Sequence, residues 1–327
     1  MKKRLLSLAL CGALLCGALA GCGGNETTSA SQEPSSSQAA EESKILTTAV
    51  GAELNTLYPL NMDVQNNIGT KLCYEGLVNY ENGDIVPCLA ESWEVSDDGL
   101  TYTFHLRDGV NWYTSDKKVY APVTAQDFVD AAKWLLTKDN ASTTANIFYN
   151  VIANAEDYFN GDITDFDQVG IHAIDEHTLE YTLVKPTPYF LKMTAYSCFL
   201  PANGKFLEEC GESFGTGAET VLSCGAYILT TFEPENRRVL EMNEDYWDKD
   251  EIYISRINYN YNKEAKTLAP ELFLRGEVSE ADIPAEILDE WINDDTRKNM
   301  LIEKPSSTSS NFLGFNFEPL YEEEYDP

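Results

Sequence analysis

The residues best suited to catalysis are few in this sequence, or poorly spaced. There are only three histidines; His105 and His172 fall in predicted strands and His177 in a predicted turn, where structural or solvent-facing roles are expected. Phosphate-binding loops, His-Glu-x-x-His and Gly-x-Ser-x-Gly are absent, and no cysteine pair has zinc-ribbon spacing. We therefore predict no catalytic residue, no metal site and no cofactor, and we expect the chain not to be an enzyme.

Carboxylates are abundant instead. The chain has 54 Asp and Glu against 23 Lys and Arg, and a formal net charge of −31. A glycosidase would need two carboxylates facing one cleft, but among so many acids a close pair in the sequence indicates little. Runs such as 165–167, 294–295 and 322–324 are interpreted as solvated loops and a polar tail. This acidity favours solubility and makes nucleic acid a poor partner, because both molecules are negatively charged.

The first residues predict export and lipid attachment. A basic start, Lys2 to Arg4, precedes an apolar stretch from Leu5 to Leu19 that is too short to span a membrane comfortably and is typical of a secretory signal. Residues 19–22, Leu-Ala-Gly-Cys, resemble the bacterial lipobox. The resemblance implies cleavage after residue 21 and acylation of Cys22, which would hold the chain on the outer face of the cytoplasmic membrane. The alternative is an ordinary signal peptide with an incidental cysteine.

Residues 22–43 are predicted to be a flexible tether. Apart from Pro34, residues 23–43 contain no apolar side chain larger than Ala, so they cannot bury enough surface to offset their chain entropy. The folded body would begin near Lys44 and, at roughly 280 residues, favours two lobes. The cysteines of the body are expected to be mostly buried thiols, and their pairing stays open. They are Cys73, Cys88, Cys198, Cys210 and Cys224.

Strand and helix patterns are mixed throughout this body and predict α/β lobes with mixed sheets. Residues 45–50 read as a strand, and turn signals join three hairpins. A capping box at Thr124 and Asp127 opens one helix, Pro284 opens another, and residues 64–78 favour a third. The predicted hairpins pair 92–95 with 101–107, 169–174 with 179–183, and 226–231 with 238–242.

Four collinear segments resemble the oligopeptide- and dipeptide-binding proteins of ABC importers, a group known as bacterial extracellular solute-binding protein family 5. They run from Val86-Pro87 to Arg107, from Val123 to Val129, from Ala173 to Phe190, and from Cys224-Gly225-Ala226 to Asn243-Glu244-Asp245-Tyr246-Trp247-Asp248. Trp93, Phe104 and several glycines in these segments also have plain structural uses as core anchors and turns. The resemblance is therefore specific for the family and not for the ligand.

The resemblance implies a periplasmic-binding-protein-like fold of two α/β lobes that close on a ligand. Residues 44–60 and 170–257 would form lobe one, residues 61–169 an inserted subdomain, and lobe two would begin at 258. A strand candidate at 311–317 runs directly into an acidic end, so lobe two is expected to be incomplete at Pro327.

The resemblance also implies a binding mode and its residues. The chain would act as a monomer that captures short peptides as an added strand and delivers them to the permease subunits of an importer. Asp63 and Gln65 are nominated as ligand contacts, although helix capping is an equal alternative for Asp63. The small-residue loop Cys224, Gly225 and Ala226 would contribute backbone contacts. Phe148 and Tyr149 are candidates for pocket walls, with a core position as the alternative.

Two departures and several rival functions stay open. Cys88 and Cys224 stand where the family usually has other small or polar residues, and the loop 112–122 is longer than usual. Within the same fold the ligand could be an oligosaccharide, a bile-acid-like solute or a nickel chelate, although the few histidines argue against nickel. A surface hydrolase, an adhesin or a peptide sensor without transport are the alternatives from other classes.

Overall fold

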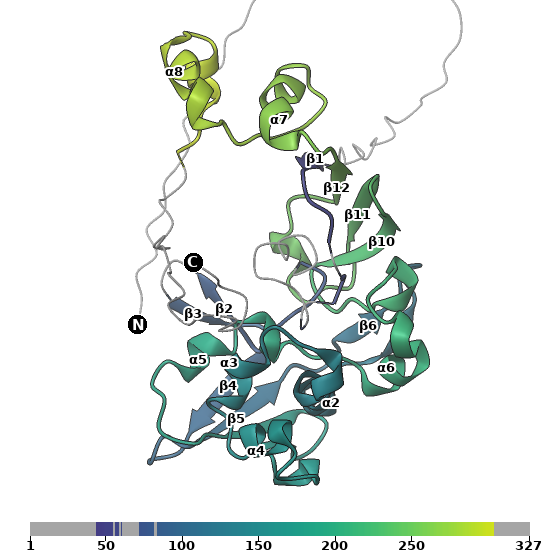
Figure 1. Cartoon of the computed structure of the whole chain (residues 1–327), viewed down its shortest axis with the longest axis vertical. Coiled ribbons are helices and arrows are strands. Elements are labelled where there is room, and N and C mark those ends of the chain that lie inside the picture. Colours follow the sequence, from purple (N-terminus) through teal and green to yellow (C-terminus); the bar gives the residue numbers. More distant parts are fainter. Residues whose placement is uncertain (1–43, 55, 59, 61–71, 82–83, 304–327) are drawn as a thin grey trace, which may run out of the picture. The chain divides into compact units, whose positions relative to one another are not determined.

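The strand β1 (Ile45–Val50) forms one edge of a four-stranded sheet. The structure, a computed structural model, describes residues 44–54, 56–58, 60, 72–81 and 84–303 (Figure 1). β1 pairs in parallel with β12 (Arg256–Tyr261), and β11 (Arg237–Met242) and β10 (Tyr227–Glu233) continue the sheet antiparallel, in the order β1-β12-β11-β10. The predicted first strand and the predicted hairpin near the end of lobe one are confirmed.

The alternation of side chains along β11 separates two environments. Arg238 and Leu240 point to one face of the sheet, because they lie opposite Tyr259 and Ile257 of β12, and Val239 points to the other. Leu240, Ile257 and Tyr259 belong to the main hydrophobic core. Arg238 is therefore a charged residue on the core-facing side of the first sheet.

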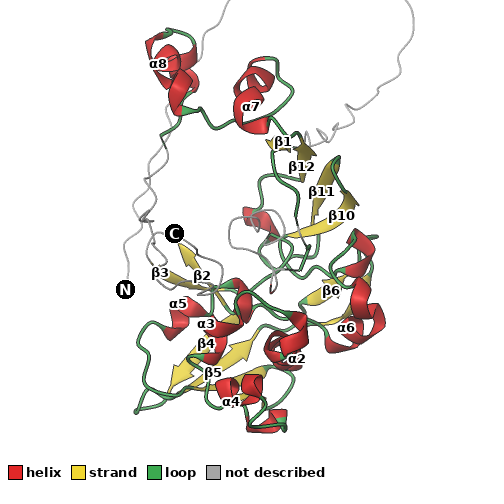
Figure 2. Cartoon of the chain, in the orientation of Figure 1, coloured by secondary structure: helices red, strands yellow, loops and turns green. Residues whose placement is uncertain are grey.

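A second four-stranded sheet has the order β4-β5-β9-β8. Its strands are β4 (Ala90–Val95), β5 (Thr101–Leu106), β8 (Ile171–Ala173) and β9 (Thr178–Thr182), all antiparallel to their neighbours. Strands β4 and β5 are labelled in Figure 2. In β5, Tyr102, Phe104 and Leu106 are buried while the residues between them are half-exposed, as the alternating pattern predicts. Both hairpins predicted in this region are confirmed.

Helix α2 (Ala125–Leu136) starts at the predicted capping box. Asp127 Oδ2 accepts the Thr124 N–H at 2.7 Å and Trp112 Nε1–H at 3.1 Å, while Oδ1 accepts Asn203 Nδ2–H at 3.0 Å. The helix contacts β8 and β9. Burial raises the pKa of Asp127 to about 6, although these three donors act in the opposite direction.

The remaining elements are short. Two small hairpins pair β2 with β3 and β6 with β7. Within the described ranges, no helix is long and apolar enough to cross a membrane. The bounds are β2 (Val78–Glu81), β3 (Asp84–Pro87), β6 (Asn111–Tyr113), β7 (Val119–Pro122), α3 (Ala145–Tyr149), α4 (Ala155–Asn160), α5 (Phe190–Met193), α6 (Gly204–Cys210), α7 (Ala265–Leu274) and α8 (Ala285–Asn293). Single-turn 3-10 segments occur between them.

Aromatic side chains hold the second sheet to the helices beside it. Phe104, Phe190 and Phe199 surround Tyr181 in edge-to-face arrangements, with ring centroids 5.5 to 6.1 Å apart. All four are at most 2% exposed. Each such side chain contributes roughly 1.5–3 kcal/mol through burial, so this cluster is a main source of stability.

The structure differs from the sequence-based expectations in one helix. Leu72 to Leu77, the end of the helix predicted over 64–78, is a turn followed by irregular backbone, and Val78 begins a strand. The remainder of that predicted helix falls largely outside the described residues. The prediction was wrong at 72–77 because these backbone groups bond to residues distant in sequence, including Cys224 and Tyr227, rather than to each other.

Strand pairing bears on the predicted lobe boundaries at two places. β8 and β9 continue the sheet of β4 and β5, so residues 171–182 pair with the proposed inserted subdomain, although they were assigned to lobe one. β12 crosses the expected boundary at 257–258 and completes the first sheet. The division into lobes itself stays a prediction.

Candidate functional site

The predicted ligand loop, residues 224–226, lies in close contact with a neighbouring backbone segment. The Cys224 and Gly225 N–H groups both donate to the Cys73 carbonyl, each at 2.9 Å. A Cβ on Gly225 would lie 2.8 Å from the carbonyl oxygens of Leu72 and Tyr74, closer than a real Cβ approaches. Glycine is therefore required at this position, because the two backbone segments approach so closely.

Asn243 holds the same loop from another direction. Its Nδ2–H donates to the Gly225 carbonyl at 3.1 Å, its backbone N–H donates to the Ala226 carbonyl at 2.9 Å, and it is 3% exposed. The Cys224 carbonyl and the Ala226 N–H have no hydrogen-bond partner among the described residues. Cys224 is 1% exposed and Ala226 is half-buried.

A partly buried carboxylate, Glu75, lies next to this arrangement. Its Oε2 accepts the Tyr246 hydroxyl at 2.7 Å. Burial raises the pKa of Glu75, while hydrogen bonds from Tyr246 and the Cys88 thiol and the charge of Arg107 lower it. Arg107 donates from Nε to the Cys88 carbonyl, and its guanidinium lies 3.8 Å from the ring centroid of Trp247. These contacts join the segment around residue 75 to the loop after β11.

Sequence reasoning missed the role of Glu75 because it placed this residue within a helix. The available signal was the segment Asn243 to Trp247, already singled out by the resemblance. Its Asn and Tyr side chains provide the hydrogen bonds to Gly225 and Glu75. The segment from Asn243 to Trp247, which the sequence analysis treated mainly as scaffold, therefore supports the 224–226 loop.

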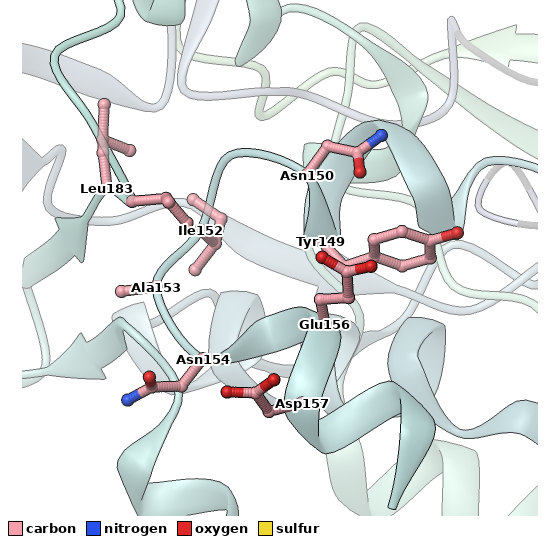
Figure 3. Close-up of a pocket in the computed structure, with 9 residues that line it drawn as sticks. Tyr149, Asn150, Ile152, Ala153, Asn154, Glu156, Asp157 and Leu183 are labelled. Carbon is pink, nitrogen blue, oxygen red and sulfur yellow. The ribbon is translucent and has the colours of Figure 1, made fainter. Parts of the chain in front are cut away.

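The two aromatic candidates from α3 have different positions. Phe148 is 1% exposed and its ring lies 5.1 Å from that of Phe199 and 6.4 Å from that of Tyr181, so it occupies the core alternative. Tyr149 lines a surface pocket of about 420 Å³ (Figure 3). The lining of this pocket consists of Asn150, Ile152, Ala153, Asn154, Glu156, Asp157, Leu183 and Val184 together with Tyr149, and it includes no residue of the 224–226 loop.

Three nominated residues lie outside the described parts of the chain. They are Asp63 and Gln65, proposed as ligand contacts, and Cys22, proposed as the lipid attachment point. Their roles stay predictions.

The cysteines of the body are free thiols. Cys73, Cys88, Cys198 and Cys224 are buried and Cys210 is half-buried. Burial raises the pKa of Cys73 and of Cys198 to about 12, which keeps both thiols protonated and poorly reactive. Within the described residues, no group of three or more His, Cys, Asp or Glu side chains could hold a metal ion.

Known proteins resemble this chain over most of its described length. Residues 84–324 match the family described as bacterial extracellular solute-binding proteins, family 5 Middle. The oligopeptide-binding protein SarA of Streptococcus gordonii is 34% identical over 249 residues, which cover 75% of this chain and 37% of SarA. The chain thus spans well under half the length of this relative.

Solved structures of oligopeptide-binding proteins are also similar to this chain. The periplasmic oligopeptide-binding protein OppAIV of Borrelia burgdorferi superposes with a TM-score of 0.70 at 30% identity, covering 77% of this chain and 50% of that protein. Listeria monocytogenes OppA bound to peptide gives 0.69 at 27% identity, covering 77% and 49%. These matches, with the mixed sheets described above, confirm the predicted α/β, periplasmic-binding-protein-like fold class. The chain belongs to the bacterial extracellular solute-binding proteins, family 5.

Proposed function

We propose that this protein captures short peptides outside the cytoplasm and delivers them to an ABC-type importer. It would do so as a monomer, held at the outer face of the cytoplasmic membrane by lipid on Cys22 and by the tether 22–43. The observation that carries this proposal is the match to oligopeptide-binding proteins such as SarA over 75% of the chain. The relatives are described as binding proteins rather than enzymes, which fits the lack of catalytic motifs in the sequence.

The candidate loop suits capture through the peptide backbone. An extended peptide presents alternating N–H and C=O groups, and the N–H of the half-buried Ala226 would offer a donor to such a strand. Backbone recognition depends little on peptide sequence. Asp63 and Gln65 are proposed as additional contacts, whereas the burial of Phe148 leaves it out of the proposed site.

Native mass spectrometry of the protein extracted gently from its own cells tests this function. We expect bound species that fragment as peptides, and a protein mass that includes diacylglycerol on Cys22. A Cys22→Ser variant should lose the lipid mass, while Cys210→Ser, a control at a half-buried thiol, should keep it. Adducts that are sugars or metal chelates, or no adduct at any peptide concentration supplied, would refute peptide capture.

A further inference from the structure

The β6–β7 hairpin includes the segment 112–122, whose length departs from the usual family pattern, and its first strand lies against the start of the 224–226 loop. The Tyr113 N–H donates to the Ser223 carbonyl at 2.7 Å, and the Ser223 N–H donates to the Tyr113 carbonyl at 2.9 Å. Both residues are buried. This pair of backbone hydrogen bonds holds the residue that immediately precedes the loop.

The hydroxyl of Tyr113 reaches the second support of the same loop. It donates to Asp245 Oδ2 at 3.2 Å, and the Asp245 N–H donates to Asn243 Oδ1, also at 3.2 Å. Asn243 in turn donates from Nδ2 to the Gly225 carbonyl at 3.1 Å. Three consecutive hydrogen bonds therefore connect the Tyr113 hydroxyl to the middle residue of the loop, while the Tyr113 backbone holds the start of the loop.

The hydroxyl is a dependable donor in this position. Burial and the negative charge of Asp245 raise the pKa of Tyr113, so the phenol stays protonated at physiological pH. Its acceptor is a carboxylate, and a hydrogen bond to a charged group contributes more than a neutral one. Asp245 is exposed, so this bond also keeps its carboxylate turned towards the hairpin instead of free in solvent.

The strand that carries Tyr113 is itself anchored on both sides. On one side, the buried Trp112 donates from Nε1 to Asp127 Oδ2 at 3.1 Å, which connects β6 to the first turn of α2. On the other, Lys117 at the turn of the hairpin forms an ion pair with Glu241 of β11. Tyr113 therefore acts on the loop from a fixed position, as a support for a binding site must.

We propose that Tyr113 is a positioning residue of the peptide site, because it holds the 224–226 loop both at its start and, through Asp245 and Asn243, at its middle. This inference rests on the proposed function and assigns part of the peptide affinity to the β6–β7 hairpin. A loop that is ordered before the ligand arrives binds more tightly, since binding does not then have to overcome the conformational entropy of the loop. The hairpin thereby influences peptide binding through the loop.

Two measurements on the full chain test this role: affinity for a randomised tetrapeptide pool, and amide hydrogen exchange of the loop. Tyr113→Phe removes only the hydroxyl, and we expect it to weaken binding roughly threefold to tenfold, the effect of one net hydrogen bond. Without peptide, the amides of residues 224 and 225 should exchange faster in this variant than in the wild type. With peptide bound, their protection should return.

Tyr120→Phe is the matched control. It removes a second hydroxyl from the same hairpin, one that donates to Glu209 Oε2 of α6 at 2.8 Å and has no hydrogen bond to either support of the loop. Peptide affinity and loop exchange in Tyr120→Phe should therefore equal those of the wild type.

A double-mutant cycle determines whether the hydroxyl acts through Asp245. Asp245→Ala should weaken peptide binding as much as Tyr113→Phe does, and the double variant should lose no more affinity than either single variant. Asp245→Asn keeps an oxygen that can accept the hydroxyl hydrogen bond, so it should retain most of the wild-type affinity. Because Asp245 is exposed, its variants test the role even if Tyr113→Phe does not fold.

Two results would overturn the positioning role. In one, Tyr113→Phe has a lower Tm but binds the tetrapeptide pool as tightly as the wild type, which is the behaviour of a purely structural residue. In the other, the affinity losses of Tyr113→Phe and Asp245→Ala add, which means that the two side chains act independently. Peptide capture would stand in both cases. If the wild type itself binds no peptide, the proposed function is refuted and this inference with it.

Discussion

Gly225→Ala tests the closest backbone contact of the candidate loop. The new Cβ would lie 2.8 Å from the Leu72 and Tyr74 carbonyl oxygens and 2.9 Å from the Cys73 carbonyl carbon. All three are backbone atoms that cannot rotate away, so the neighbouring segment must move. Overpacking of this kind costs roughly 1–3 kcal/mol. For domains of about 150–250 residues, Tm falls by about 2–4 °C for each kcal/mol.

The assay is thermal unfolding followed by circular dichroism, with peptide affinity measured on the same samples. Gly51→Ala is the control, because a Cβ there meets its nearest atoms at 3.7 to 3.9 Å, an ordinary contact distance. The movement forced by Gly225→Ala also shifts the Cys73 carbonyl that holds the loop, so peptide affinity should fall together with Tm. A Gly225→Ala protein with the Tm and affinity of the wild type would refute the close contact.

Three further predictions follow from buried polar groups. The pKa of Asp127 is raised from 3.8 to about 6, so the folded state binds the carboxyl proton more tightly than the unfolded state does. The contribution of Asp127 to the free energy of unfolding should therefore fall by up to about 3 kcal/mol as pH rises from about 4 to 7. Asp127→Asn should remove that pH dependence. Tyr246→Phe should cost about 1–3 kcal/mol in urea unfolding, since it leaves Glu75 without its hydroxyl donor. Asn243→Ala should cost about 1–2 kcal/mol by the same assay and weaken peptide binding, because it releases the Gly225 carbonyl.

The Tyr246 prediction has a matched control, and each of the three predictions has a result that would contradict it. Tyr80→Phe, at an exposed hydroxyl 3.5 Å from Lys192 Nζ, should leave the urea midpoint unchanged. An equal loss of unfolding free energy in Tyr246→Phe and Tyr80→Phe would show that the hydrogen bond from Tyr246 to Glu75 adds no stability of its own. For Asp127, an unchanged stability difference between pH 4 and pH 7 in the Asn variant would disprove the assignment. If Asn243→Ala is less stable but binds peptide with unchanged affinity, the 224–226 loop does not take part in peptide binding.

Local patterns predicted the local structure of this chain. The alternation of Tyr102, Phe104 and Leu106 identified β5 and its buried face, and Thr124 with Asp127 identified the start of α2. These predictions succeed because each depends on residues a few positions apart. A hairpin turn or a capping box is determined largely by its own sequence.

Long-range pairing limited the remaining predictions. Leu72 to Leu77 carry apolar residues at near-helical spacing, but their carbonyls are used by Cys224, Gly225 and Tyr227, and no local pattern indicates such partners. The assignment of residues 170–257 to lobe one came from the family resemblance, whereas the sheet that β8 and β9 join is determined by their pairing with β5. The division into lobes stays a prediction. In the candidate site, the loop at Gly225 was predicted from family resemblance. Glu75 is apparent only from its burial and its hydrogen-bond partners.

The parallel pairing of β1 with β12 makes the first folded strand depend on a much later part of the chain. Asn258 Nδ2–H donates to Thr47 Oγ1 at 3.2 Å across 211 residues of sequence. Closing so long a loop is entropically unfavourable until the intervening strands have formed, and among the described strands β1 pairs only with β12, which is synthesised much later. In a chain proposed for export, this order of assembly delays completion of the first sheet during synthesis.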